Sequence, residues 1–371
     1  MDKQAIDLNG KTILVTGAAG FIGAALVMRL ASNLSGATII GIDSMNSYYD
    51  VSLKEYRLRK IEENFAESEN SNLWHFERGS IADERLVEKM FGKYSPDIVV
   101  NLAAQAGVGY SIDHPRDYIE SNIIGFFNIL EACRHSCDNA KSGVEHFVYA
   151  SSSSVYGANA KIPYSTNDKT DSPVSLYAAT KKSNELLAHA YAKLYNIPST
   201  GLRFLTVYGQ AGRPDMAYFK FTNKLRNNEM IKIYNYGNCE RDFTYIDDIV
   251  EGMMRVMRGS PKRKKGDDGL PIPPTAVYNI GGGHPVNLME FVRTLSEELI
   301  KADVLPKNYD FDAHIKLVPM QPGDVAVIYA DTKALERDYG YRPMTGLRHG
   351  LGEFARWYKE SLIKVGVYGE R

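Results

Sequence analysis

A tyrosine and a lysine four residues apart form the pair in this sequence best suited to move a proton. Tyr177 and Lys181 lie in Tyr-Ala-Ala-Thr-Lys, inside a helical pattern that opens at Ser175. A spacing of four puts both side chains on one face of a helix. A phenol is a weak base at neutral pH, but a nearby ammonium favours the phenolate. The pair predicts a general acid and base, although such a pair alone is more often an exposed helix contact.

A run of four serines, Ser151 to Ser154, precedes this pair and follows the apolar segment 147–150. We expect the run at the carboxyl end of a strand, where ligands of parallel sheets bind. A hydroxyl there, as at Ser152, could share a proton with a substrate hydroxyl. By itself the run is more typical of a serine-rich turn, so its position carries the prediction.

Three glycines near the N-terminus have the spacing of an anion-binding turn. Gly17-Ala18-Ala19-Gly20-Phe21-Ile22-Gly23 lies between a predicted strand and a predicted helix. Glycine allows the chain to approach a pyrophosphate, and the amides at the start of a helix supply hydrogen bonds. Asp43, twenty residues after Gly23, is placed to accept bonds from adenosine ribose hydroxyls and to repel a 2'-phosphate. Together they predict NAD rather than NADP; a plain loop with a capping aspartate is less favoured.

Apolar runs and helical patterns alternate around these residues. Strands are predicted at 12–15, 38–42, 74–77, 98–103, 147–150 and 200–204, and helices at 21–34, 53–65, 84–91, 115–137 and 175–195. Strands that are apolar on both faces and alternate with helices are typical of a parallel sheet covered on each side. The sequence therefore predicts a doubly wound α/β fold.

Composition narrows the classes of function. The 371 residues are 44% hydrophobic, and 44 Lys and Arg nearly balance 45 Asp and Glu, so no overall field attracts nucleic acid or an anionic membrane. Neither a signal peptide nor a membrane span is expected. Three cysteines do not make a disulfide framework, and we expect a cytoplasmic protein.

Two other clusters invite a functional interpretation that we do not favour. The basic run in 259–274 could meet an anionic partner, but a solvated loop partly neutralised by Asp267 and Asp268 is preferred. Cys133, His135 and Cys137 resemble metal ligands, but on a helix the histidine would point away from both thiols. We therefore expect no metal site.

Over 11–358 the sequence resembles the nucleotide-sugar epimerases of the extended short-chain dehydrogenase/reductase superfamily, most closely UDP-glucuronate 4-epimerases. The segments that carry the resemblance are the glycine turn, Tyr48-Tyr49-Asp50, Leu102 to Val108, Tyr177 with Lys181, Arg203 to Gly209, Arg213 to Met216 and Arg241 to Asp248. Three positions, Ser80, Gly109 and Gln210, depart from the family pattern.

The resemblance implies a Rossmann-type sheet with a smaller, mainly C-terminal α/β substrate domain. The expected NAD-binding domain is 1–205, with 243–280 returning to it, and 206–242 and 281–371 would bind the UDP-sugar. It implies a homodimer packed through the helices near 115–137 and 175–195. Its implied catalytic residues are Ser152, Tyr177 and Lys181, with Lys181 also on the nicotinamide ribose. Its other implied cofactor residues are Gly17, Ala19, Gly20, Phe21, Ile22, Gly23, Asp43, Ser44, Asn46, Ile81, Leu102, Ala103, Ala104, Gln105 and Asn122. Those for substrate are Ser152, Ser153, Thr206, Arg213, Arg241 and Asp324.

Arg213 is the candidate for substrate choice, because its planar fork can meet a sugar carboxylate with two hydrogen bonds. The expected reaction is an inversion at carbon 4 of UDP-glucuronate through a 4-keto sugar, with Tyr177 moving the hydroxyl proton and NAD regenerated. Epimerisation of UDP-glucose and UDP-galactose, or of UDP-xylose and UDP-arabinose, is the nearer alternative. A non-catalytic NAD-binding sensor is the farther one, because the Tyr-Lys pair is intact.

Overall fold

The computed structural model describes residues 3–139, 143–320 and 326–363. Its centre is a parallel sheet in the order β15-β7-β6-β5-β2-β3-β4. The strands are β2 (Thr12–Thr16), β3 (Thr38–Asp43), β4 (Leu73–Arg78), β5 (Ile98–Asn101), β6 (His146–Ser152), β7 (Ser199–Phe204) and β15 (Thr275–Ile280). The chain runs outward from β2 to β4 and then returns to β5 on the other side of β2, so a crevice opens there.

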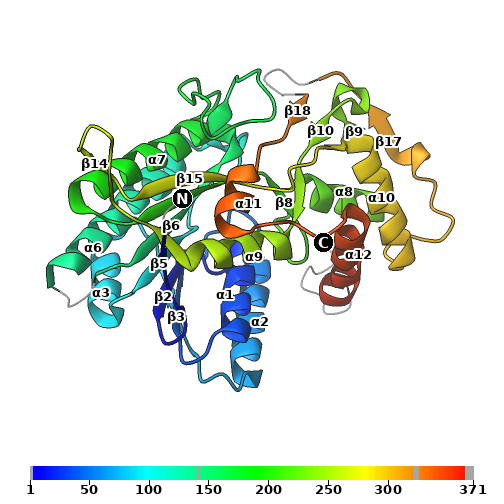
Figure 1. Ribbon diagram of the computed structural model, residues 1–371. Helices are drawn as coiled ribbons and strands as arrows, with labels where there is room; N and C mark the ends of the chain where they lie inside the picture. Colours follow the sequence, from blue (N-terminus) through cyan, green and yellow to red (C-terminus); the bar gives the residue numbers. More distant parts are fainter. Residues whose placement is uncertain (1–2, 140–142, 321–325, 364–371) are drawn as a thin grey trace.

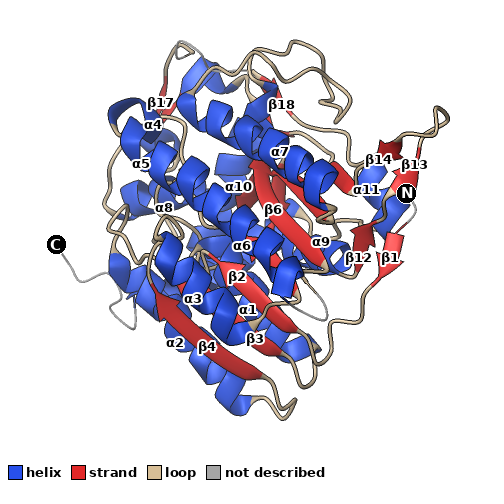
Figure 2. Cartoon of the chain, turned by 90° about the vertical axis from the view of Figure 1, so that its left-hand side faces the viewer, coloured by secondary structure: helices blue, strands red, loops and turns tan. Residues whose placement is uncertain are grey.

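Helices cover both faces of this sheet, as Figures 1 and 2 show. The covering helices are α1 (Phe21–Asn33), α2 (Val51–Glu67) and α9 (Ile246–Met257) on one face, and α3 (Glu84–Tyr94), α6 (Gly125–Asn139) and α7 (Leu176–Tyr195) on the other. The four central strands, almost fully buried, pack between these layers. The predicted doubly wound α/β fold is confirmed.

A second group of elements lies beside the sheet, on the right of Figure 1. Its helices are α8 (Ala217–Arg226), α10 (Leu288–Lys301) and α12 (Leu347–Trp357). The helix α11 (Lys333–Tyr339) instead packs on β15 and α9 of the first group. The short strands of the second group are β8 (Thr206–Tyr208), β9 (Ile231–Ile233), β10 (Glu240–Arg241), β11 (Phe243–Tyr245), β16 (Val286–Asn287), β17 (Ile315–Leu317) and β18 (Val327–Ile328). Aromatic side chains fill its interior, including Phe291 stacked on Phe243 with centroids 3.8 Å apart. This interior is continuous with the apolar layer under α1 and α9.

Two predicted segments differ from the structure. The helix expected over 115–137 is interrupted: α5 (Pro115–Tyr118), a π-helical stretch (Ile119–Ile124) and α6 follow one another. The loop expected over 259–274 contains β12 (Gly259–Pro261), paired with β1 (Lys3–Ala5), and a small hairpin of β13 (Lys264–Lys265) and β14 (Pro271–Ile272). The β1–β12 pairing joins segments far apart in the chain, so no local pattern reveals it.

Candidate active site

A cavity lies at the carboxyl ends of the central strands, where the crevice was expected. Most of the predicted cofactor and catalytic residues line it together: Gly17, Gly20, Phe21, Ile22, Gly23, Asp43, Ser44, Asn46, Ile81, Leu102, Ala103, Ala104, Gln105, Ser152, Tyr177 and Lys181. Arg213 lines the same cavity. Residues separated by more than 190 positions therefore share one space.

The glycine turn leaves no room for side chains. Gly17 has a φ of +71°, and a Cβ there would lie 2.8 Å from the Ala103 nitrogen. A Cβ on Gly23 would lie 2.1 Å from the Gly17 carbonyl oxygen. The turn leads directly into α1, whose N-cap, Gly20, has an extended backbone and no side-chain cap. Backbone amides at this helix start suit a pyrophosphate, so these residues fit a dinucleotide.

Asp43 is held by the turn and by a lysine that the sequence patterns did not single out. Its carboxylate accepts hydrogen bonds from the backbone nitrogens of Ala19 (3.2 Å) and Met45 (2.9 Å). The ammonium of Lys54, on α2, lies 3.6 Å from Asp43 and donates to Asn46 Oδ1 at 2.8 Å. Burial lowers the pKa of Lys54, and Asp43 opposes that shift. The sequence placed Lys54 on an amphipathic helix, and only the tertiary structure brings it into the cavity.

Tyr177 and Lys181 project from the first turns of α7, which Ser175 caps by accepting a bond from Ala178 N at 3.1 Å. Lys181 is almost fully buried; its ammonium donates to the Ala150 carbonyl at 2.9 Å, and burial lowers its pKa to about 8. Burial also raises the pKa of the Tyr177 phenol, while a hydrogen bond to Ser152 and the charge of Arg213 oppose that rise. The three groups expected to act on a hydroxyl thus meet in one place.

A buried ion pair, absent from the sequence predictions, supports the strand end that carries Ser152. Glu185 follows Lys181 by one turn of α7 and binds the Arg203 guanidinium with two bonds of 2.7 and 2.8 Å. The Ser151 hydroxyl donates to the same carboxylate at 2.7 Å. The Arg203 guanidinium also lies over the Tyr156 ring, with its Cζ 4.8 Å from the ring centroid. This cluster ties α7, β6 and β7 together directly beside the catalytic candidates.

Arg213 already has a partner within the protein. Its Nε and Nη2 donate to the two carboxylate oxygens of Asp215 at 2.9 and 2.6 Å, and both side chains are 24% exposed. The Tyr48 hydroxyl donates to the same carboxylate at 3.2 Å. Burial and Asp215 raise the pKa of Tyr48 to about 12. One edge of the Arg213 fork is therefore occupied by the protein's own carboxylate.

Several predicted site residues do not line the cavity. Asn122 is buried and bridges two walls: its amide binds both backbone groups of Gln105 and donates to Thr180 Oγ1 at 3.0 Å. Thr206 pairs with Phe243 between β8 and β11. The other members of this group are Ala19, Ser153 and Arg241, whose Nη1 donates to the Glu240 and Ala326 carbonyls. Asp324 lies outside the described residues, so its role stays a prediction.

The three departures from the family pattern have distinct surroundings. Ser80 lines the cavity next to Ile81. Gly109 precedes the short helix α4 (Tyr110–Asp113), in ordinary helical backbone. Gln210 Nε2 donates to Glu353 Oε2 at 3.2 Å. Of the three, only Ser80 contributes to the wall of the cavity.

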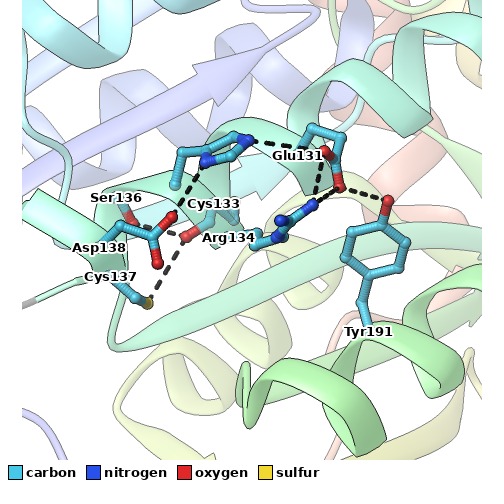
Figure 3. Close-up of polar contacts among 8 residues, drawn as sticks. Glu131, Cys133, Arg134, Ser136, Cys137, Asp138 and Tyr191 are labelled. Carbon is cyan, nitrogen blue, oxygen red and sulfur yellow. Dashed lines mark hydrogen bonds and ion pairs between the residues drawn. The ribbon is translucent and has the colours of Figure 1, made fainter.

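The cluster on α6 is satisfied by ordinary polar contacts (Figure 3). His135 lies 3.0 Å from Asp138 and 3.6 Å from Glu131, and Tyr191 donates to Glu131 at 2.5 Å. The Cys137 thiol donates to the Cys133 carbonyl at 3.6 Å. Within the described ranges no three His, Cys, Asp or Glu side chains gather as a metal site.

Comparison with known proteins completes this picture. Residues 13–281 match the model of the NAD dependent epimerase/dehydratase family. The chain belongs to this family. Its relatives include Protein CapI of Staphylococcus aureus, 49% identical over 94% of this chain and 98% of that protein. UDP-glucuronate 4-epimerase 4 of Arabidopsis thaliana is 44% identical over 94% of this chain and 76% of its own length.

A solved structure has the same fold. It is the UDP-glucuronic acid 4-epimerase of Bacillus cereus in complex with UDP-glucuronic acid and NAD, with a TM-score of 0.75 and 29% identity over 94% of this chain and 99% of that one. The family's cofactor, NAD, agrees with the glycine turn and Asp43. No helix in the described parts of the chain is long and apolar enough to cross a membrane.

Proposed function

We propose that this epimerase-family chain interconverts UDP-glucuronate and its 4-epimer, UDP-galacturonate. The observation that carries the substrate assignment is the Arg213 guanidinium, which lines the same cavity as Tyr177 and acts on its pKa. A uronate carboxylate is the substrate group that needs such a cation. The relatives named UDP-glucuronate 4-epimerase support the same reading.

The proposed roles follow from the contacts. The glycine turn would hold the pyrophosphate of NAD, Asp43 the adenosine ribose, and Lys181 the nicotinamide ribose. Bound NAD supplies the acceptor and then the donor of a hydride at carbon 4 of the sugar. Tyr177, assisted by Ser152, takes the proton of the carbon 4 hydroxyl and later returns it. Because the proton and the hydride both come back, the net redox change is zero.

The nearby carboxylates are tied to cations, which favours epimerisation over elimination or decarboxylation. Glu185 is bound by Arg203 and Ser151, and Asp215 by Arg213 and Tyr48. Arg213 holds the pKa of Asp215 below its usual range despite burial. A free carboxylate beside a 4-keto sugar could remove a proton at carbon 5, and these two are occupied.

A second candidate, epimerisation of UDP-glucose and UDP-galactose, is favoured by one feature. Asp215 already neutralises Arg213, so a neutral sugar would not leave an unpaired cation in the cavity. The two candidates differ in whether the substrate carboxylate meets the remaining edge of the Arg213 fork.

The deciding experiment incubates the purified protein with UDP-glucuronate, UDP-glucose and UDP-xylose and separates the 4-epimers by chromatography. Tyr177→Phe should lower every rate by at least about 100-fold, because a positioned acid and base is lost. Arg213→Ala should lower kcat/KM for UDP-glucuronate about 10- to 100-fold, the value of charge-assisted bonds. Arg213→Lys, which keeps the charge but not the fork, should be intermediate. Equal turnover of neutral sugars by the native protein would assign the second candidate instead.

The UDP-sugar would bind between the two groups of elements. We propose that 1–205 and 243–280 hold NAD, and that 206–242 and 281–371, with Thr206 and Arg241, hold the nucleotide. The packing of β15 on β7 and of α9 on α1 supports the first assignment. The three free cysteines, Cys133, Cys137 and Cys239, support a cytoplasmic location.

A homodimer is part of the proposal. Apolar side chains on α7 and the π-helical stretch line a shallow hollow, and two of them are exposed: Ile119 by 44% and Leu186 by 60%. Two more exposed apolar side chains, Ile124 (46%) and Phe127 (42%), lie at the end of the π-helical stretch and the start of α6. An exposed apolar patch of this kind is typical of a protein interface. We propose that a second copy of the chain covers it.

A further inference from the structure

We infer that Arg57 is a positioning residue that couples cofactor binding to the loop carrying Arg213. Arg57 lies on α2 and is 1% exposed. Among the described residues no carboxylate forms an ion pair with it, although its guanidinium donates five hydrogen bonds. A buried cation without a counter-charge is costly, so its surroundings must compensate.

The five bonds join three separate segments. Nη1 donates to the Ala19 carbonyl, within the glycine turn, at 3.0 Å and to the Tyr49 hydroxyl at 2.6 Å. Nε and Nη2 donate to the Ala211 carbonyl at 2.9 and 2.7 Å, and Nη2 also reaches the Gly212 carbonyl at 3.1 Å. Arg57 is therefore a direct link between the cofactor turn and the two residues before Arg213.

The linked loop has little freedom to move independently. Ala211 has a φ of +51°, unusual for a residue with a side chain. A Cβ on Gly212 would lie 1.6 Å from the Tyr218 hydroxyl, so the backbone fits tightly against α8. The next residue, Arg213, binds Asp215 and lines the cavity. A shift of the Arg57 contacts would therefore be transmitted to the Arg213 fork.

The missing counter-charge connects this link to NAD. The pyrophosphate expected at the glycine turn is anionic, and the turn is one of the segments that Arg57 holds. We expect bound NAD to compensate the guanidinium charge and to fix its contacts with Ala211 and Gly212. Arg213 would then be held in the position that binds the sugar carboxylate only when the cofactor is present. This coupling rests on the proposed function, because Arg213 is its point of contact with the substrate.

The test measures ligand binding instead of turnover. In a Tyr177→Phe background, which should not convert the sugar, calorimetry gives the affinities for UDP-glucuronate, UDP-glucose and UDP, with and without NAD, on protein stripped of nucleotide. We expect NAD to raise the affinity for UDP-glucuronate at least about fivefold, a typical size for coupling between sites. Arg57→Lys keeps the charge but cannot make the forked contacts, so it should reduce that factor to less than about twofold. We expect the affinity for NAD itself to change by a smaller factor than the coupling does.

Two further variants separate coupling from stability. Arg59→Lys, on the exposed side of α2, is the matched control and should keep the full effect of NAD. Tyr49→Phe removes one acceptor from Arg57 without changing charge, and should give an intermediate effect; it carries the test if Arg57→Lys does not fold.

The outcomes distinguish the two levels of the proposal. Full coupling in folded Arg57→Lys or, where that variant does not fold, in Tyr49→Phe would overturn the role of Arg57. If the parent protein binds UDP-glucose as well as UDP-glucuronate, the proposed role of Arg213 in substrate choice is wrong, and the effect of NAD on UDP-glucose binding still tests the link. If Arg57→Lys reduces the effect of NAD on UDP-glucuronate affinity and leaves the affinity for UDP unchanged, the result supports a role of Arg57 confined to the sugar end of the site.

Discussion

At the scale of single residues, the site depends on how burial and charge set the proton affinity of one phenol. Burial raises the pKa of Tyr177 and so disfavours the phenolate that would act as the base. The hydrogen bond to Ser152 and the charge of Arg213 both lower this pKa. Arg213 thus has two proposed tasks: it meets the substrate carboxylate, and it keeps the phenolate accessible at lower pH. These tasks can be separated with a substrate that has no carboxylate.

The first prediction concerns the pH dependence of kcat/KM for UDP-glucose. A base must lose its proton before it acts, so the rate rises with pH through the pKa of Tyr177 in the free enzyme. Arg213→Ala removes a charge that lowers this pKa, and the rising limb should move to higher pH. Arg213→Lys keeps a cation and should leave the limb near its original place. A limb that does not move in Arg213→Ala would mean that Arg213 has no influence on the phenol.

Sequence reasoning found the residues whose types are distinctive, and it missed those defined by their surroundings. The glycine turn, Asp43, Tyr177 and Lys181 are recognisable because their chemistry and spacing are unusual together. Lys54, Arg57 and Glu185 look like ordinary charges on amphipathic helices, which usually face water. Only the packed structure shows that these three are buried beside the site.

At the scale of elements, six of the seven strands of the sheet could be predicted, because most of them are apolar runs between helical patterns, whereas β15 lies beyond 205, where that alternation weakens. The π-helical stretch inside the predicted 115–137 helix could not be predicted, because no local sequence pattern distinguishes it from an α-helix. That stretch carries Asn122, which fastens the loop at Gln105 to Thr180 on α7. The fastening explains why a residue outside the cavity can matter for the cofactor.

Asn122→Asp should therefore weaken both the protein and its hold on NAD. The new carboxylate oxygen would face the Gln105 carbonyl, leaving buried acceptors without a donor at a cost of about 1–3 kcal/mol. Urea unfolding measures the stability, and the NAD content of the purified protein measures retention. Asn167→Asp, at an exposed position, is the control. An unchanged unfolding free energy would show that the bridge contributes nothing.

His146 makes the β6–β7 pair sensitive to acid. It is fully buried, its Nε2 lies 2.8 Å from Thr200 Oγ1, and burial lowers its pKa from 6.5 to about 4. The unfolded chain then binds a proton that the folded chain does not, so stability falls as pH drops below about 6.5 and levels off below about 4. The expected loss from this group is about 2 kcal/mol between pH 7.5 and pH 5.

Urea titrations at these two pH values test the effect of His146. His146→Gln should flatten the acid dependence by about that amount. His189→Gln, on the exposed side of α7, should leave the dependence as it is. Parallel curves for His146→Gln and the native protein would place the acid sensitivity elsewhere.

At the scale of the whole molecule, the proposed dimer accounts for the apolar patch on α7 and its neighbours. Leu186→Glu should dissociate the dimer, because association would bury a carboxylate without a partner. Its effect on the fold should stay within about 0.5 kcal/mol, since Leu186 is 60% exposed. Light scattering after size exclusion measures the mass. Leu270→Glu, equally exposed but on the β13–β14 hairpin, is the control; a dimer that survives Leu186→Glu would move the interface to another face.

The order of the strands also has a consequence for synthesis on the ribosome. Six of the seven strands are complete once Phe204 has emerged, and they can pair in their final order. The seventh, β15, comes from 275–280 and covers the outer edge of β7. Until then β7, whose six residues are all buried in the finished sheet, presents an edge with unpaired backbone groups. The nascent chain is therefore most exposed to unwanted strand pairing while 205–274 is being made, and a chaperone that binds extended segments would protect it there.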